Sequence, residues 1–148
     1  MKVATYFRKS RITNRFLIGA IAIAIPLSAQ ERFQSGEFKG FTISATEHQI
    51  VKLDKSINVR SVRGDILFAT QNDTLADVLF EIRGPNESDR IRSATSGASG
   101  QFKIPHVPEG TYAFKATKDG FSSVVGTLIV SKQNARDARI KIEMPIGN

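Results

Sequence analysis

The sequence predicts an all-β fold, an antiparallel, Greek-key-type β-sandwich of about seven strands. Apolar and polar residues alternate with a period of two along residues 111–117 and 138–144, which is typical of half-buried strands. Turn signals such as Pro108-Glu109-Gly110 and Asp119-Gly120 interrupt the chain at short intervals. The 148 residues are 41% hydrophobic, enough for one domain with its own core.

The first 29 residues have the layout of a secretory signal peptide. A basic segment ends at Arg15, an apolar run occupies residues 16–25, and Ala29 is small enough to precede a cleavage site. We expect cleavage between Ala29 and Gln30, followed by a periplasmic or extracellular location. The apolar run is shorter than the roughly 20 residues that a membrane-spanning helix needs, so no stable span is expected after cleavage.

The positive charge of the chain lies mostly in this leader. The net charge is +7, and residues 1–29 contribute +5 of it without a single acidic residue. The rest of the chain holds 16 basic and 14 acidic residues and is nearly neutral. Nucleic-acid binding needs a clustered basic face, so no nucleic-acid partner is expected.

The chain contains no cysteine. Disulfides, lipid attachment at a cysteine and cysteine-based metal sites are therefore excluded. An exported domain of this kind must be held together by its core alone. This favours a bacterial envelope or secreted setting over a small eukaryotic ectodomain.

Residues 30–49 are polar with scattered aromatic residues. We expect a flexible lead-in there, with a short strand over residues 41–45, and a folded domain over residues 50–148. Short strands are predicted at 50–53 and 57–59, and residues 58–68 should supply the first long strand. Gly64 indicates a bulge within that strand.

Residues 75–83 fit two structures. Their apolar residues match helical spacing at Leu75, Val78, Leu79 and Ile82, and strand spacing at Val78, Phe80 and Ile82. The run is short and Gly84-Pro85 stops it, which favours the strand, with Glu81 and Arg83 facing water.

The remaining segments complete the predicted sandwich. Residues 84–100 form a long polar loop that includes a short edge strand at 90–94, and a strand over 102–104 must end near Pro105. Tyr112, Phe114 and Ala116 share the core face of the next strand. The later elements are a strand at 122–130, apolar on both faces and so placed in mid-sheet, a turn at 133–136 and the last strand at 138–144.

Three segments carry a resemblance to a known family. They read S-G-A-S-G-Q-F at 96–102, I-P-H-V-P-E-G-T-Y at 104–112 and K-D-G-F at 118–121. Together they resemble the carboxypeptidase regulatory-like domain family over residues 58–144, although Ser96 and Gly97 stand where that family has Thr and Asp. The resemblance implies a prealbumin-like, or transthyretin-like, β-sandwich and supports a strand at 75–83. Such domains are non-catalytic appendages in many settings, so it implies little about function.

The residues give no support for catalysis, a cofactor or a metal. His48 and His106 are the only histidines and lie far apart in sequence, and no G-x-S-x-G motif occurs. The hydroxyisourate hydrolases, which resemble transthyretin, end in Y-R-G-S, whereas this chain ends in M-P-I-G-N. Ala116 stands where cross-linking collagen-adhesin domains of this type carry a glutamate. We therefore expect no enzyme activity.

The function class that remains is the binding of another molecule. The loop at 84–100, the turn at 105–110 and free strand edges could each serve it, and we single out Arg90, Arg92, His106 and Glu109 as interaction residues. The expected function is an exported, non-catalytic module that binds a bacterial envelope or extracellular protein. The alternative is a carbohydrate-binding module of the same fold, against which the absence of Trp counts. A third reading is a purely structural accessory domain.

Overall fold

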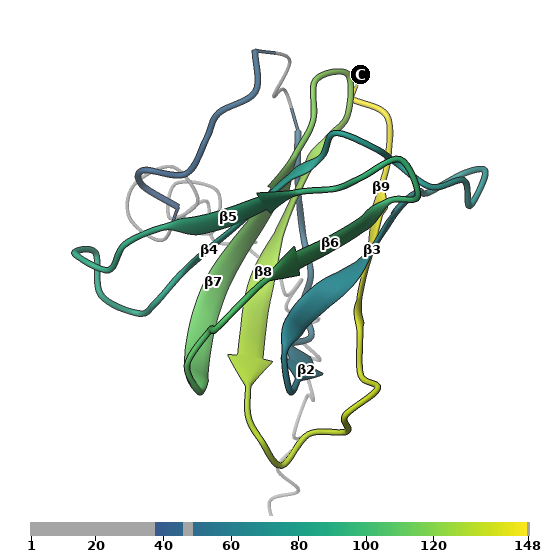
Figure 1. Ribbon diagram of the computed structural model, residues 1–148. Helices are drawn as coiled ribbons and strands as arrows, with labels where there is room; N and C mark the ends of the chain where they lie inside the picture. The colour runs from purple at the N-terminus through teal and green to yellow at the C-terminus, as the bar shows by residue number, and fades with distance from the viewer. Residues whose placement is uncertain (1–37, 46–48, 148) are drawn as a thin grey trace, which may run out of the picture.

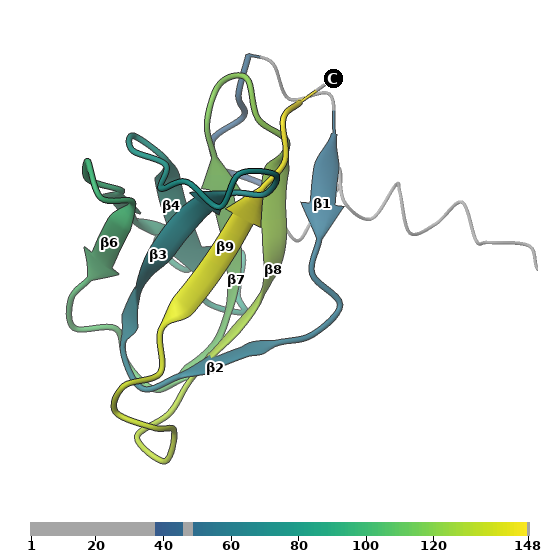
Figure 2. The ribbon, with the colours of Figure 1, turned by 90° about the vertical axis from the view of Figure 1, so that its right-hand side faces the viewer.

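The computed structural model describes residues 38–45 and 49–147 and folds them into a two-layer β-sandwich (Figures 1 and 2). The strands are β1 (Ile50–Lys52), β2 (Ile57–Val59), β3 (Val62–Phe68), β4 (Leu79–Arg83), β5 (Arg92–Thr95), β6 (Gln101–Ile104), β7 (Gly110–Thr117), β8 (Ser123–Val130) and β9 (Ile140–Met144). One sheet has the order β1-β8-β7-β4-β5, with β2 also on β8, and the other has the order β6-β3-β9. The expected signal peptide and the Ala29–Gln30 cleavage site lie outside the described residues.

The core lies between the two sheets and is built from alternate residues of the strands. Ile140, Ile142 and Met144 of β9 are fully buried, whereas Lys141 and Glu143 between them are exposed, as the period of two predicts. Phe80 of β4 joins the layers: its ring centroid lies 4.3 Å from that of Phe102 in the opposite sheet. The predicted all-β sandwich is thus confirmed.

The predicted antiparallel pairing is confirmed for β3 with β6 and for β5, β4, β7 and β8, but the sheets are mixed and three other pairings of the described strands are parallel. β9 runs parallel to β3, with Ile142 opposite Ile66, and both β1 and β2 run parallel to β8. Alternation along a strand tells which face is buried but not which way the neighbouring strand runs. The described chain also has nine strands, more than the seven or so expected, because several are only three to five residues long.

The predicted long strand over 58–68 is in fact two strands in different sheets. β2 pairs with β8, whereas β3 pairs with β6 and β9, so the chain changes layer at Arg60-Ser61. No bulge occurs at Gly64, which keeps regular register with Phe102 and Ile140. A Cβ at this position would overlap the carbonyl oxygen of Ile140, so glycine is needed for the close approach of β9.

Residues 75–83 form no helix, and the strand preferred from the sequence is confirmed as β4. The Oγ of Ser96 stabilises the approach to this strand, since it accepts from the Val78 amide at 3.0 Å and donates to the Leu75 carbonyl at 2.7 Å. The predicted edge strand at 90–94 is β5, which begins two residues later and ends one residue later. β8 lies in mid-sheet, between β7 and the short strands β1 and β2, as expected.

Residues 38–45 pack across the outer face of the larger sheet, and the strand predicted over 41–45 is not present. Phe41 is buried beneath the guanidinium of Arg83, which lies 5.3 Å from the ring centroid and also donates to the Lys39 carbonyl. The backbone amide and Oγ1 of Thr42 donate to the Glu81 carboxylate at 2.9 and 3.0 Å.

This covering segment changes the environment of the charged residues beneath it. The prediction that Glu81 and Arg83 face water is wrong, because each is only 6% exposed, and Lys115 beside them is 3% exposed. Glu81 lies directly opposite Lys115 on β7. Burial of opposite charges is tolerable only when they have partners, and the covering segment supplies two of the donors to Glu81.

We expect Glu81→Ala to lower the free energy of unfolding by about 2–3 kcal/mol, because it removes both bonds to Thr42 and leaves Lys115 buried opposite a neutral residue. Urea denaturation measures the change. Glu143→Ala is the matched control, since that exposed carboxylate makes a surface pair with Lys141. Equal losses of unfolding free energy in the two variants would show that the buried Glu81 contributes no more to stability than a surface carboxylate.

Candidate binding groove

An open groove of about 860 Å³ lies at one end of the larger sheet. One wall is the β4–β5 loop and the start of β5, and the other is the end of β6 with the β6–β7 turn. Two arginines, an aspartate and a glutamate line it together with the apolar surfaces of Pro85, Pro105 and Tyr112.

The structure brings the sequence-predicted interaction residues together. Arg90, Arg92 and Glu109 all line the groove. His106 is exposed beside it, and Nη1 of Arg92 donates to the His106 backbone carbonyl at 2.8 Å. This bond links the two walls, which lie 14 residues apart in sequence.

Local contacts fix the β6–β7 wall. The hydroxyl of half-buried Tyr112 donates to the Pro108 carbonyl at 2.9 Å, which closes the turn onto its own strand. Oε1 of Glu109 accepts from the Lys132 amide at 2.5 Å and so ties the turn to the segment after β8. His106 has a φ of 54°, a backbone conformation that non-glycine residues adopt mainly in tight turns.

The β4–β5 wall is folded back on itself. The Asp89 amide donates to the Asn86 carbonyl at 3.0 Å, and the Asn86 amide donates to Oδ2 of Asp89 at 3.0 Å. A Cβ at residue 84 would overlap that carboxylate, so Gly84 allows the loop to fold this tightly. A second concavity of about 390 Å³ lies on the other side of Tyr112 and Pro85.

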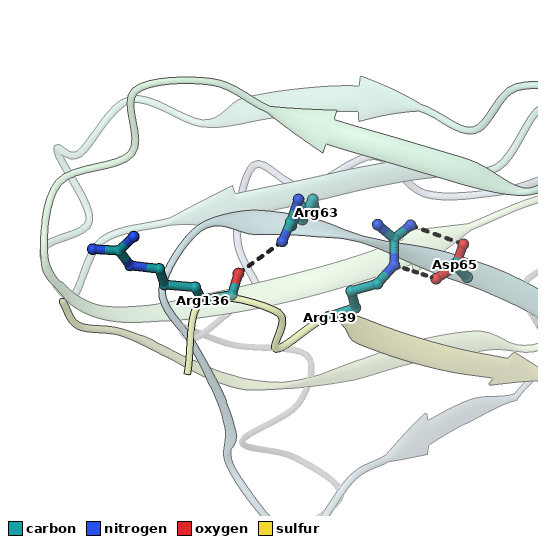
Figure 3. A network of polar contacts seen from close by, with 4 residues as sticks. All are labelled: Arg63, Asp65, Arg136 and Arg139. Carbon is teal, nitrogen blue, oxygen red and sulfur yellow. Dashed lines mark hydrogen bonds and ion pairs between the residues drawn. The ribbon is translucent and has the colours of Figure 1, made fainter. Parts of the chain in front are cut away.

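A third concavity, of about 490 Å³, lies further along β5 and is lined by Arg63, Lys103 and Arg139 with no acidic residue. Nε and Nη2 of Arg139 donate to the two oxygens of Asp65 at 2.8 and 3.0 Å (Figure 3). Nη2 of Arg63 donates to the Arg136 carbonyl at 2.7 Å. The sequence did not predict this cluster of Arg63, Lys103 and Arg139. Alternation along a strand indicates which side chains are exposed, but not which exposed side chains from different strands lie close together.

The ion pair shifts the ionisation of both partners. The hydrogen bond from Arg139 lowers the pKa of the Asp65 carboxyl, against a smaller opposing effect of burial, and the same bond raises the pKa of Arg139. Both side chains are about one-third exposed, so solvent weakens the attraction.

Within residues 38–45 and 49–147, no three His, Cys, Asp or Glu side chains lie together in a way that could hold a metal ion. Nor does any helix of this part of the chain have the length and apolar character to cross a membrane. His48 lies outside the described residues.

The two packed sheets and the groove at one end define a small, all-β sandwich domain. A family model described as the carboxypeptidase regulatory-like domain matches residues 61–144. The chain belongs to this family, and the resemblance seen in its turn motifs is confirmed.

Comparison with curated proteins gives no match. Among the solved structures that are similar is 3-chlorocatechol 1,2-dioxygenase from Rhodococcus opacus 1CP, with 10% sequence identity and a TM-score of 0.45. The match covers 82% of this chain and 79% of that chain. A likeness this distant carries no argument about activity.

We expect Asp65→Asn to destabilise the protein at neutral pH and to have a smaller effect in acid. The folded-state pKa of Asp65 lies below the usual 3.8, so its ion pair stabilises the fold above that pH. This contribution is lost as the pH falls through the lowered pKa. Urea unfolding at about pH 7 and about pH 2.5 measures the difference. Asp54→Asn, in the exposed β1–β2 loop, is the control, and a pH-independent effect of Asp65→Asn would contradict the expectation.

Proposed function

We propose that the chain is an exported, non-catalytic module that binds a protein of the bacterial envelope, in the periplasm or outside the cell. The observation that carries the proposal is the groove in which Arg90, Arg92 and Glu109 gather, with His106 at its edge. Membership of a regulatory-like domain family supports a role without chemistry.

The composition of the groove favours a protein partner. Arginine and tyrosine side chains beside apolar surface are the residues that contribute most to protein–protein binding, and Arg90, Arg92 and Tyr112 provide them here. The bonds from Arg92 to His106 and from Tyr112 to Pro108 fix both walls before binding. A preformed surface loses less conformational entropy when a partner binds.

A carbohydrate ligand is the second candidate, and one observation favours it. Tyr112 lies between two adjoining concavities and lines both, where an aromatic ring could contact a sugar. The aromatic residues of the lead-in add little to such a surface. Phe41 is buried under Arg83, and Phe38 is half-buried with its ring centroid 5.6 Å from that of Phe41.

Capture of envelope proteins by the immobilised chain tests the proposal. We expect a discrete protein to be retained, and Arg90→Glu to reduce its retention by about tenfold or more without changing the melting temperature, because Arg90 is exposed in the groove. Lys55→Glu, on the exposed β1–β2 loop, makes the same charge change away from the groove and should bind normally.

The same capture, repeated after enzymatic removal of glycans, separates the two candidates. Retention that survives favours the protein partner, and retention that disappears with the glycans favours the carbohydrate-binding module. If Arg90→Glu binds as well as the unaltered chain, the groove is not the binding surface.

Export makes a separate prediction. When the complete gene is expressed in bacteria, we expect the protein in the periplasmic or extracellular fraction, with an N-terminal sequence that begins at Gln30. Mass spectrometry of the intact protein measures the N-terminus. A cytoplasmic protein that retains residues 1–29 would contradict export.

A further inference from the structure

Two strand edges face a common slot on one side of the sandwich. β5 is the last strand of the larger sheet, β6 is the last strand of the smaller one, and the two approach each other (Figure 1). Every residue of both strands lines either the main groove or the concavity at Arg63, Lys103 and Arg139. The two concavities together therefore follow the whole length of β5 and β6.

The strand register shows which backbone groups point into this slot. The Ser96 amide donates to the Val78 carbonyl, and Leu79 lies opposite Thr95. Because bonding direction alternates along an antiparallel strand, the amides and carbonyls of Ser93 and Thr95 point away from β4. None of the described strands pairs with that side of β5.

The neighbouring edge has the same character. The Ile66 amide donates to the Gly100 carbonyl at 2.9 Å, so the alternation along β6 directs the backbone groups of Lys103 away from β3. Edge groups of this kind are a template for an added strand. Serine and threonine at 93 and 95 are small, so no bulky side chain blocks the approach.

The slot also carries a net positive charge, whereas residues 30–148 as a whole are nearly neutral. Five cationic residues line its two concavities: Arg63, Arg90, Arg92, Lys103 and Arg139. The acidic residues in the lining are Asp89 and Glu109, and Arg139 is already paired with Asp65 beside it. Five cations against these three carboxylates leave a net charge of +2, which complements an acidic ligand.

We propose that this slot binds an extended, acidic peptide segment of a partner protein, which adds as a further strand to the free edge of β5. The proposal rests on the protein-binding function proposed above and names its mode and its partner class. Main-chain bonds to Ser93 and Thr95 supply sequence-independent affinity. Side chains of the added strand alternate in direction, so every second one faces the slot, where carboxylates meet the cations.

A library of random octapeptides displayed on phage tests the proposal with the purified chain as bait. We expect enrichment of sequences with acidic residues at alternate positions, and binding that weakens as salt is added. Ser93→Pro removes the outward amide without touching the bonds to β4, and should weaken peptide binding about tenfold or more. Ser56→Pro, in the exposed loop before β2, is the matched proline control and should bind normally.

A peptide variant keeps the test independent of protein folding. The selected peptide is synthesised in two phases, one with N-methyl groups on the odd-numbered residues and the other with N-methyl groups on the even-numbered residues. One phase should abolish binding and the other should leave it intact, because only alternate amides of an added strand face β5. Equal binding of both phases would overturn strand addition.

The remaining outcomes separate this inference from the proposed function. If Ser93→Pro binds peptides normally while Arg90→Glu does not, the groove binds protein but not by strand addition. If neither the library nor envelope extract yields a ligand, both proposals fail. If the chain dimerises through an association that Ser93→Pro abolishes, the edge is occupied by a second copy and the acidic-peptide proposal is overturned.

Discussion

The stacking of Phe80 between Phe102 and Phe114 is the contact on which the rest of the sandwich depends. Its ring lies 4.3 Å from Phe102 in the smaller sheet and 5.4 Å from Phe114 on the adjacent strand β7. Because residues alternate along β4, fixing Phe80 inward also fixes Glu81 outward, where residues 38–45 cover it. One strand thus holds the core on one face and the covering segment on the other.

The position of the groove also depends on how β4 pairs with its neighbours. β4 ends at Arg83, and its pairing with β5 and β7 sets where the β4–β5 loop and the β6–β7 turn can meet. The Arg92 bond to the His106 carbonyl then links them. The proposed recognition residues therefore lie on short loops that are tethered to a packed sheet, an arrangement common in binding proteins.

The sequence predicted well which face of each strand is buried, but it predicted poorly which strands pair with one another. The alternation of apolar and polar residues along 138–144 and around Phe114 correctly predicted which side chains are buried. The turn motifs between Pro105 and Gly110 indicated the family and also form one wall of the groove. Parallel pairing of β3 with β9, and the cover over Glu81, depend on contacts between residues about 40 or more apart. Local pattern contains no signal for such contacts, so Arg63, Lys103 and Arg139 could not be grouped beforehand.

The parallel pairing of β3 with β9 has a consequence for how the chain folds. Gly64 pairs with Ile140, so β3, the middle strand of the smaller sheet, gains its second neighbour only once β9 has been synthesised. Until then Ile66 has no partner on one side and the core stays open. Such non-local topology gives a high contact order and slow folding. The sandwich therefore reaches its native state only after β9 has been synthesised.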